Sequence, residues 1–420
     1  MVFNKKVKEK KKFLAELSRF SVFEALRTHG PLAVDDIMRL TGLSKPTVVN
    51  YLRGLERAKL VVPQGFGPST GGRAPVLYEF ASKSHFVVGV EFEIPKVRLG
   101  VTDLGRKVVA RATYYVSRDD SADTIMQQLI AQIENLLVNG RIPRDKVYGI
   151  GLGLSGFLNN RTGVYLESPR APHWKNVPIR ARLQMHFGVP VFIEALCNVL
   201  ALGELGEKTP ISNNDNVGYI GFVHGLGAGV FLNGQLYQGR FGNVALLGHT
   251  TVDMNGDRCY CGNRGCLELY ASGRALERRF KSLMAPDNPS SSSRLALPGE
   301  PTSEQIILAA NDGDPICRWE LLRSMDYLAV GIANMVDLFE LQTIILGGDL
   351  ALAGEWLAEY VQAAVQDRLM NVLKQNLRVL PATMHPDDAG IVGASTLVLR
   401  EIFRQPTLDL SWSIDNMVAK

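Results

Sequence analysis

Three of the chain's five cysteines lie within eight consecutive positions, and this cluster restricts the local backbone more than any other feature of the sequence. Cys259, Cys261 and Cys266 form a C-x-C-G-x-x-G-C element, and His249 precedes the first of them by ten residues. Three thiolates and one imidazole suit tetrahedral zinc. Such tight spacing is typical of a metal site in a reducing compartment rather than of a disulfide framework. We therefore predict a zinc site formed by these four residues.

The predicted zinc site is closed, because four protein ligands fill a tetrahedral coordination sphere. A metal held in this way stabilises the fold and generates no reactive hydroxide. Gly262 and Gly265 lie between the cysteines, where glycine permits the tight backbone that three converging sulfurs require. The alternative is a group of unliganded buried thiols beside an incidental histidine.

The N-terminal end of the chain carries its positive charge. The first 80 residues hold 14 Lys and Arg against 7 Asp and Glu, a net charge of +7, whereas the remainder holds 32 against 35, a net charge of −3. A basic end of this kind is where a polyanion would bind. The lysine run in residues 5–12 is equally well explained as a solvated tail.

Three short helices are expected after the lysine run, at residues 16–29, 34–41 and 44–58. Gly30 and Gly42 follow the first two helices, and Ser44 is suited to cap the third. A two-stranded wing is then expected from the apolar residues 60–62 and 76–80, which a Gly/Pro/Ser-rich loop separates. This order of elements predicts a winged helix-turn-helix domain.

The third helix has two different faces. Val48, Leu52 and Leu55 fall at i, i+4 and i+7, so they are expected to pack against the first two helices. The opposite face carries side chains that reach base edges and phosphates in a major groove. With one arginine at the base of the wing, the candidate DNA contacts are Ser44, Lys45, Thr47, Asn50, Tyr51, Arg53 and Arg73.

DNA binding has one structural alternative, a three-helix module that binds protein. The combination of short helices, glycine turn and basic wing favours double-stranded DNA as the partner. A duplex operator has two-fold symmetry and one such module buries little surface, so we expect a homodimer or a tetramer.

Residues beyond about position 84 alternate between strands and longer helices, which predicts an α/β fold. The predicted elements are strands at 85–93, 96–102, 147–154, 191–193 and 343–346, a glycine-rich hairpin at 218–234, and helices at 125–138 and 325–339.

A cytoplasmic, nucleoid-associated protein is expected. Hydrophobic residues make up 46% and charged residues 21% of the chain, as in soluble globular proteins. The most apolar long stretch, residues 327–346, contains Asp337 and Glu340, whose burial in hydrocarbon would be costly. The lysine-rich N-terminus lacks the apolar segment of a secretion signal.

The chain resembles the ROK family of bacterial repressors and sugar kinases over nearly its whole length, in the branch of glucose, xylose and N-acetylglucosamine repressors. The resemblance rests on the helix-turn-helix, the G-R-x-P element at 72–75, the Gly-His and cysteine element ending in Glu268, Gly347-Gly348 and Gly393-Ala394. It implies two actin/hexokinase-like lobes around a cleft that takes sugars. The expected division is a winged helix-turn-helix domain (1–82), a first lobe (83–195), a second lobe with the zinc loop and a return helix (196–405), and a tail (406–420).

The residues for phosphotransfer are missing from this sequence. Family kinases use the Asp of an E-N-D-A-N stretch as general base, and Leu196 stands at that position in Glu194-Ala195-Leu196-Cys197-Asn198. Loss of a general base typically costs about 100-fold to 10,000-fold in rate. The family's D-x-G-x-T phosphate loop is replaced by residues 91–95, where two acids and a proline would repel phosphate. We therefore predict that the body is not an enzyme.

The sugar contacts are eroded as well. Ala195, Leu196 and Leu246 replace polar family residues, and only Gly156, His249 and Glu268 remain as candidate ligand-binding residues. A site without hydrogen-bond partners should reject a polyol. Glu268 has an alternative role as the cap of the helix after the zinc loop.

The leading hypothesis is a DNA-binding transcriptional regulator, a repressor of carbohydrate-related genes, with a catalytically inactive body. Its effector would be sugar-like but unusually apolar, or not a small molecule. The alternatives are a sugar kinase with a DNA-binding arm, and a repressor that a protein partner controls.

Overall fold

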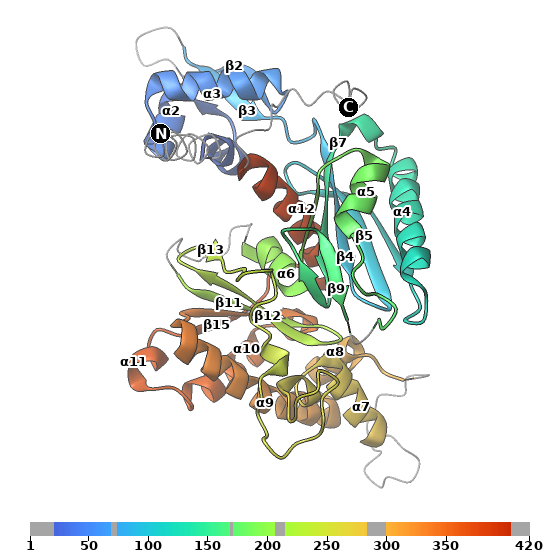
Figure 1. The fold of residues 1–420 in the computed structure, drawn as a ribbon. Coiled ribbons are helices and arrows are strands. Elements are labelled where there is room, and N and C mark those ends of the chain that lie inside the picture. The colour runs from blue at the N-terminus through green and yellow to red at the C-terminus, as the bar shows by residue number, and fades with distance from the viewer. Residues whose placement is uncertain (1–20, 69–73, 169–170, 206–214, 284–299, 405–420) are drawn as a thin grey trace, which may run out of the picture.

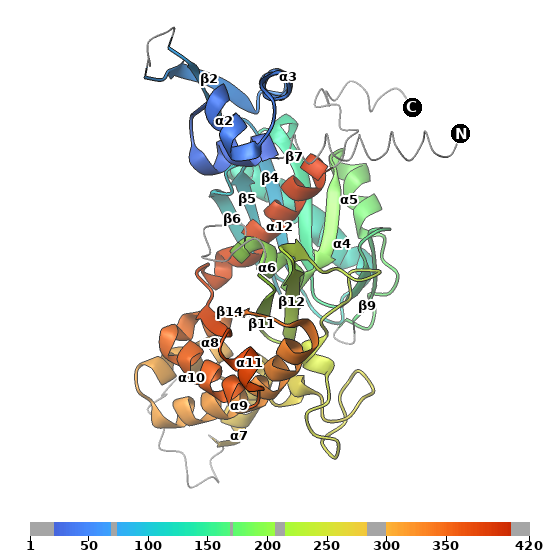
Figure 2. The same ribbon diagram turned by 90° about the vertical axis from the view of Figure 1, so that its left-hand side faces the viewer.

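The protein consists of a small N-terminal domain and two larger lobes (Figure 1). The computed structural model describes residues 21–68, 74–168, 171–205, 215–283 and 300–404. The N-terminal domain lies against the first lobe, and the second lobe lies at the opposite end of the molecule (Figures 1 and 2). Within these ranges, none of the helices has the length and apolar character that a membrane span requires.

The N-terminal domain packs its helices on a three-stranded antiparallel sheet. Helical residues 21–29 precede the other elements, which are β1 (Leu32–Ala33), α2 (Val34–Thr41), α3 (Lys45–Arg57), β2 (Val61–Phe66) and β3 (Val76–Phe80). The predicted wing is confirmed, because β2 and β3 pair antiparallel, and the sheet has one strand that was not predicted, since Leu32 and Ala33 pair with Tyr78 and Leu77. Two apolar residues after Pro31 are too short a run to be recognised as a strand from sequence.

The turn between α2 and α3 has the predicted geometry. Gly42 ends α2 in the left-handed conformation, with φ of 68°, and its amide donates to the Met38 carbonyl. Val48, Leu52 and Leu55 of α3 are buried against the rest of the domain, as their helical spacing predicts.

The first lobe is built on a five-stranded sheet with the order β10-β7-β4-β5-β6. Its elements are β4 (Phe86–Phe92), β5 (Lys96–Asp103), β6 (Val108–Tyr115), α4 (Ala122–Asn139), η1 (Arg144–Lys146), β7 (Val147–Leu154), β8 (Phe157–Asn159), β9 (Val164–Glu167), α5 (Ile179–Phe187) and β10 (Val191–Ala195). Strands β4, β7 and β10 are parallel, and β5 and β6 extend the sheet antiparallel. Helices α4 and α5 contribute to the hydrophobic core on one face of this sheet.

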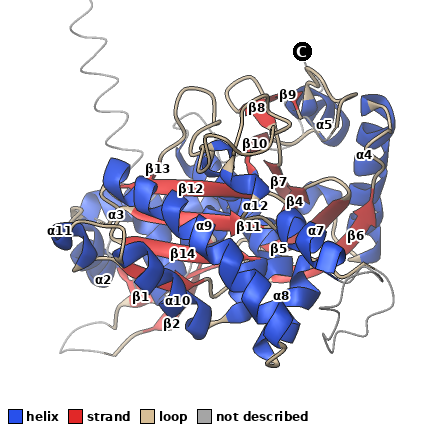
Figure 3. Cartoon of the chain, turned by 90° about the horizontal axis from the view of Figure 1, so that it is seen from below, coloured by secondary structure: helices blue, strands red, loops and turns tan. Residues whose placement is uncertain are grey.

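The second lobe has a sheet with the order β13-β12-β11-β14-β15, covered by several helices (Figure 3). Its elements are α6 (Leu196–Leu205), β11 (Val217–Phe222), β12 (Leu226–Leu232), β13 (Gln235–Leu236), η2 (Leu247–His249), η3 (Leu267–Leu269), α7 (Gly273–Leu283), α8 (Ser303–Asn311), α9 (Pro315–Phe339), β14 (Thr343–Gly348), η4 (Asp349–Ala353), α10 (Glu355–Gln366), α11 (Asn371–Lys374) and β15 (Arg378–Pro381). Helices α7 to α10 form the main core of the lobe with the sheet.

The last helix, α12 (Pro386–Arg404), returns from the second lobe to the first and runs toward the N-terminal domain (Figure 1). It packs against α6 and against strands β4 and β7. Glycines permit this close packing: a Cβ on Gly151 of β7 would lie 2.0 Å from the Ala394 carbonyl oxygen, and one on Gly393 would lie 1.9 Å from that of Val199. The helix therefore joins all three parts of the molecule.

The N-terminal domain shares a hydrophobic core with the body. Val398, Leu399 and Ile402 of α12 belong to the same buried cluster as Phe23 and Val61 of the N-terminal domain. Val87 and Leu104 of the first lobe also belong to it. Helix α12 and the domain that carries α3 therefore share one buried core.

Candidate DNA-binding face, metal centre and interlobe cleft

The polar face of α3 is open to solvent at the end of the molecule that lies farthest from the second lobe (Figures 1 and 2). Ser44, Lys45, Asn50 and Arg53 are exposed, whereas Thr47 and Tyr51 are half-buried. Lys45 forms an ion pair with Asp35, with 3.3 Å between Nζ and Oδ1. Arg73 lies outside the described residues. The remaining predicted contacts thus lie on one helix, as a major-groove reader requires.

Ser44 does not cap α3 in the predicted way. It has the extended conformation of an N-cap residue, but its side chain accepts no backbone hydrogen bond from the helix. Its hydroxyl lies 2.8 Å from Oγ1 of Thr47 instead. Both hydroxyl groups therefore remain on the polar face.

The four predicted metal ligands converge in the loop between η2 and η3. One ligand atom from each of His249, Cys259, Cys261 and Cys266 lies within 4.8 Å of the others. Cys259 Sγ lies 3.7 Å from His249 Nδ1, and Cys261 Sγ lies 3.6 Å from Cys266 Sγ. Zinc–sulfur bonds of about 2.3 Å give tetrahedral edges of about 3.8 Å, so the donor set fits a tetrahedral metal.

Gly265 makes this convergence geometrically feasible. It has a φ of 58°, and a Cβ at this position would lie 1.6 Å from the Asp253 carbonyl oxygen. Gly262 also has a positive φ, of 94°. The expected need for glycine at both positions is confirmed, and at Gly265 the close approach of the backbone adds a second reason.

Tyr260, between the first two cysteines, connects the metal loop to the cleft between the lobes. Its hydroxyl lies 3.5 Å from His249 Nε2 and donates to Glu268 Oε1 at 2.5 Å. The other carboxylate oxygen, Oε2, accepts from the Leu226 amide at 3.2 Å. Both carboxylate oxygens of Glu268 are thus held by protein groups at the edge of the cleft.

The interlobe cleft is a small cavity of about 130 Å³. Gly156, His249 and Glu268 all line it, so the structure brings together the three candidate ligand-binding residues that the family resemblance predicted. The apolar replacements Ala195, Leu196 and Leu246 line it too. The cleft therefore has the predicted apolar character and little room.

Cys197 of α6 packs against two paired glycines of the β11–β12 hairpin, which borders the cleft. A Cβ on Gly221 or Gly227 would lie 2.7 or 2.6 Å from the Cys197 sulfur. Burial raises the pKa of this thiol to about 12, so it stays protonated at neutral pH. Sequence reasoning missed Cys197, because its importance depends on a strand that packs against it from a distant part of the chain.

The turn that replaces the family phosphate loop is acidic and internally paired. Glu91 forms an ion pair with Arg98, which also donates from Nε to Asp387 Oδ1 at 3.2 Å. Burial raises the pKa of Glu91, and the neighbouring Arg98 opposes that rise. Because two carboxylates neutralise the positive charge of Arg98, this side chain would attract a phosphate group only weakly.

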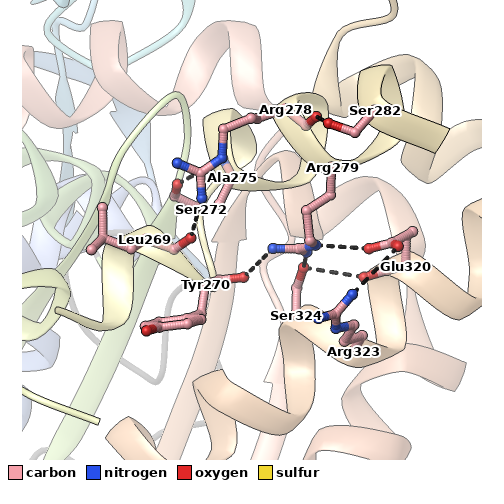
Figure 4. A network of polar contacts seen from close by, with 10 residues as sticks. All are labelled: Leu269, Tyr270, Ser272, Ala275, Arg278, Arg279, Ser282, Glu320, Arg323 and Ser324. Carbon is pink, nitrogen blue, oxygen red and sulfur yellow. Dashed lines mark hydrogen bonds and ion pairs between the residues drawn. The ribbon is translucent and has the colours of Figure 1, made fainter. Parts of the chain in front are cut away.

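A half-buried arginine links the segment that follows η3 to α9 (Figure 4). Arg279 of α7 donates to the Tyr270 carbonyl at 2.8 Å and to Glu320 Oε2 at 2.7 Å. Burial lowers the pKa of Arg279, while Glu320 raises it. Since Glu320 is 1% exposed, this ion pair is shielded from water and is expected to be strongly coupled.

Replacing Glu320 by glutamine is expected to lower the free energy of unfolding by about 1–3 kcal/mol, because half-buried Arg279 would lose its counter-charge while the shape of the side chain is kept. Urea unfolding followed by circular dichroism measures the loss. Glu359→Gln, on the exposed face of α10, is the matched control and should change little. Equal stabilities of the two variants would contradict the proposed coupling.

Comparisons with known proteins agree with these features. The ROK family profile matches residues 87–401, and the IclR helix-turn-helix domain profile matches residues 20–65. A xylose repressor of Caldicellulosiruptor bescii is 28% identical over 94% of this chain and 98% of its own length. A glucokinase of Thermotoga maritima is 29% identical over 75% of this chain and 98% of its own length.

The fold is similar to that of a solved regulator. The crystal structure of a ROK family transcriptional regulator, a homologue of the Escherichia coli MLC protein, covers 94% of this chain and the whole of that one, with a TM-score of 0.75 and 25% identity. The similarity therefore extends through the N-terminal domain as well as the two lobes.

Proposed function

The chain belongs to the ROK family, and we propose that it is a DNA-binding transcriptional repressor of carbohydrate-related genes. The observation that carries this proposal is the exposed polar face of α3, in a helix-turn-helix domain that shares its core with a ROK body. The sequence similarity to the xylose repressor from C. bescii, which spans 98% of that protein's length, supports the proposal. Residues 1–82 would bind the operator, and the two lobes, 83–195 and 196–405, would control that binding.

Genome-wide mapping of bound DNA tests whether the protein binds operators and represses the neighbouring genes. Crosslinked fragments should share an inverted repeat, because two copies of α3 read half-sites about one helical turn apart. Deleting the gene should raise transcription of carbohydrate genes beside the bound sites. Purified protein that ignores double-stranded fragments at low ionic strength would contradict the proposal, since phosphate contacts are strongest there.

The metal in the His249 and cysteine cluster is proposed to be zinc. Soft thiolates with one imidazole select zinc among the common divalent ions of the cell. Bound zinc would hold the loop between His249 and Cys266 and stabilise the fold. His249 Nε2 lies on the side of Tyr260 and the cleft, so the metal loop also positions one cleft wall.

We propose that the body does not catalyse the transfer of phosphate to a sugar. Leu196 has no group that accepts a proton, and Arg98 is paired with acids where the family has a phosphate loop. The similarity to a glucokinase keeps a kinase as the second candidate. Incubation with ATP, Mg²⁺ and a panel of hexoses and pentoses should give no sugar phosphate above background. Phosphorylation of any of these sugars would support the kinase instead.

Regulation is proposed to act through α12 in a homodimer or tetramer. The helix contacts both lobes and the N-terminal core, so a change in the body would alter the distance between two copies of α3. A coupling free energy of about 1–3 kcal/mol is enough for control. The alternative, release by a protein partner, would show as a partner that is recovered from extract and lowers operator affinity.

A further inference from the structure

We propose that a neutral mono- or disaccharide binds in a second cavity, which lies beside α12 and which we call the α12 pocket. This inference rests on the proposed function, since it names the effector site of a carbohydrate-responsive repressor. The α12 pocket has a volume of about 730 Å³, against about 130 Å³ for the interlobe cleft. Small-molecule sites usually measure about 300–1,000 Å³, so of these two cavities among the described residues the α12 pocket has the usual size.

The first lobe, the second lobe and the returning helix α12 all contribute to the α12 pocket. Asn160, Arg180 and Gln184 line it from the first lobe, Gln238 from the second lobe, and Leu397 and Glu401 from α12. Glu194 borders this pocket, and the next residue, Ala195, borders the interlobe cleft. The end of β10 thus separates the two cavities, and the α12 pocket is distinct from the site that the family uses.

The floor of the α12 pocket is held rigid by two buried or half-buried charges. Glu194 is fully buried, and its carboxylate accepts from Asn160 Nδ2, Gln238 Nε2, Asn198 Nδ2 and the Ala195 amide. Arg180 donates to the carbonyl oxygens of three residues that frame the pocket, Val191, Arg161 and Asn160. Glu194 therefore uses its full acceptor capacity and acts as a positioning residue.

The groups that remain around the pocket suit a polyol. Because Asn160 and Gln238 turn their amide nitrogens to Glu194, their side-chain oxygens stay uncommitted among the described hydrogen bonds. The amide of Gln184 and the guanidinium of Arg161 are exposed and likewise have no described partner. These groups offer both donors and acceptors, and a ring hydroxyl can use either.

The charge and the apolar wall of the pocket favour a neutral sugar over a sugar phosphate. Its described lining contains two arginines, Arg161 and Arg180, and two glutamates, Glu194 and Glu401, so the formal charges cancel. The half-buried ring of Phe192 and the side chains of Val189 and Leu397 supply an apolar surface for sugar C–H groups. The lining thus combines polar groups that can orient a ring with apolar side chains that can contact its C–H groups.

A sugar in the α12 pocket would contact the elements that hold the DNA-binding domain. Leu397 and Glu401 face the pocket, while Val398 and Ile402 of the same helix lie in the core shared with that domain. Phe192 lines the pocket and also packs against this core. Filling the pocket would therefore bias the position of α3, and the sequence-based expectation of an unusually apolar effector would be unnecessary.

Isothermal titration of the full-length protein with D-xylose, D-glucose, xylobiose and cellobiose tests the site. We expect one of these sugars to bind, and Arg161→Ala and Gln184→Ala to weaken it at least about tenfold, since both remove exposed groups without disturbing the core. The matched control is Leu246→Trp, which fills the interlobe cleft from a half-exposed position and should leave the affinity unchanged. The bound sugar should also lower operator affinity about 5-fold to 150-fold.

Three results would overturn the inference. The first is that Leu246→Trp abolishes sugar binding. The second is that sugar affinity is unchanged in both Arg161→Ala and Gln184→Ala. The third is that none of the four sugars binds to the unmodified protein. Gel shifts without sugar are measured in parallel with the same preparations. A protein that binds its operator but no sugar would refute the α12 pocket alone, whereas a protein that binds no DNA would refute the proposed repressor.

Discussion

Replacing Cys259 by alanine is expected to remove about one zinc ion per chain and to cause the largest loss of stability of any single substitution considered. Structural zinc contributes apparent binding free energies of about 10–16 kcal/mol in small domains, and a three-ligand site keeps only part of this. The loop from His249 to Cys266 contains little regular secondary structure and is held by turn hydrogen bonds and two isolated bridges, so the metal would be a main cross-link within it. Metal analysis of purified protein and thermal unfolding give the two readouts.

Cys317→Ala is the matched control for the zinc experiment. Cys317 is a fully buried cysteine in α9 that does not belong to the metal cluster. Its replacement creates a small cavity, at a cost of about 1 kcal/mol, and should leave the zinc content intact. If Cys259→Ala keeps the melting temperature and the DNA affinity of the unmodified protein, the stabilising role of the metal is wrong.

The double variant Asn50→Ala/Arg53→Ala should lose at least about 30-fold in affinity for the operator. Each side chain that reads a base or binds a phosphate contributes about 1–3 kcal/mol to specific binding. Both residues are exposed on the polar face of α3, so the domain should still fold. Fluorescence anisotropy with a labelled operator, taken from the genome-wide map, measures the change.

Arg118→Ala removes one positive charge from the exposed surface of the first lobe and serves as the control for the DNA experiment. It should leave the affinity unchanged, because it lies in the lobe rather than in the helix-turn-helix domain. The salt dependence adds a second readout, since loss of one phosphate contact lowers the slope of log K against log salt by about 1. Unchanged operator affinity in the double variant would exclude α3 as the recognition helix.

Local sequence patterns predicted the elements whose ends are marked by turn residues. Helix α2 and strand β7 have the predicted bounds, because glycine or a short turn closes them. Helix α9 starts at Pro315, ten residues before the predicted start at Met325. The signal was present, since Asp314 caps the helix by accepting from the amides of Ile316 and Cys317, and proline suits the first turn.

The candidate sites differ in how far sequence could find them. The metal ligands lie within 18 positions of one another, so spacing alone indicated that they would converge. The α12 pocket combines residues near positions 160, 184, 238 and 401, which share no periodic pattern. The family resemblance predicted an apolar cleft, but it could not show that a larger polar cavity lies on the other side of β10.

The sequence by itself predicted the helix-turn-helix, the metal loop and a body without the family's catalytic carboxylate, because each prediction depends on residues that are close together in the chain. Only the tertiary structure decided how these parts are connected. Helix α12 reaches the N-terminal core from the opposite end of the chain, and glycines in β4, β5 and β7 allow it to pack there. Packing of this kind depends on the complementary shapes of surfaces from distant parts of the chain. The spacing of neighbouring residues does not predict those shapes.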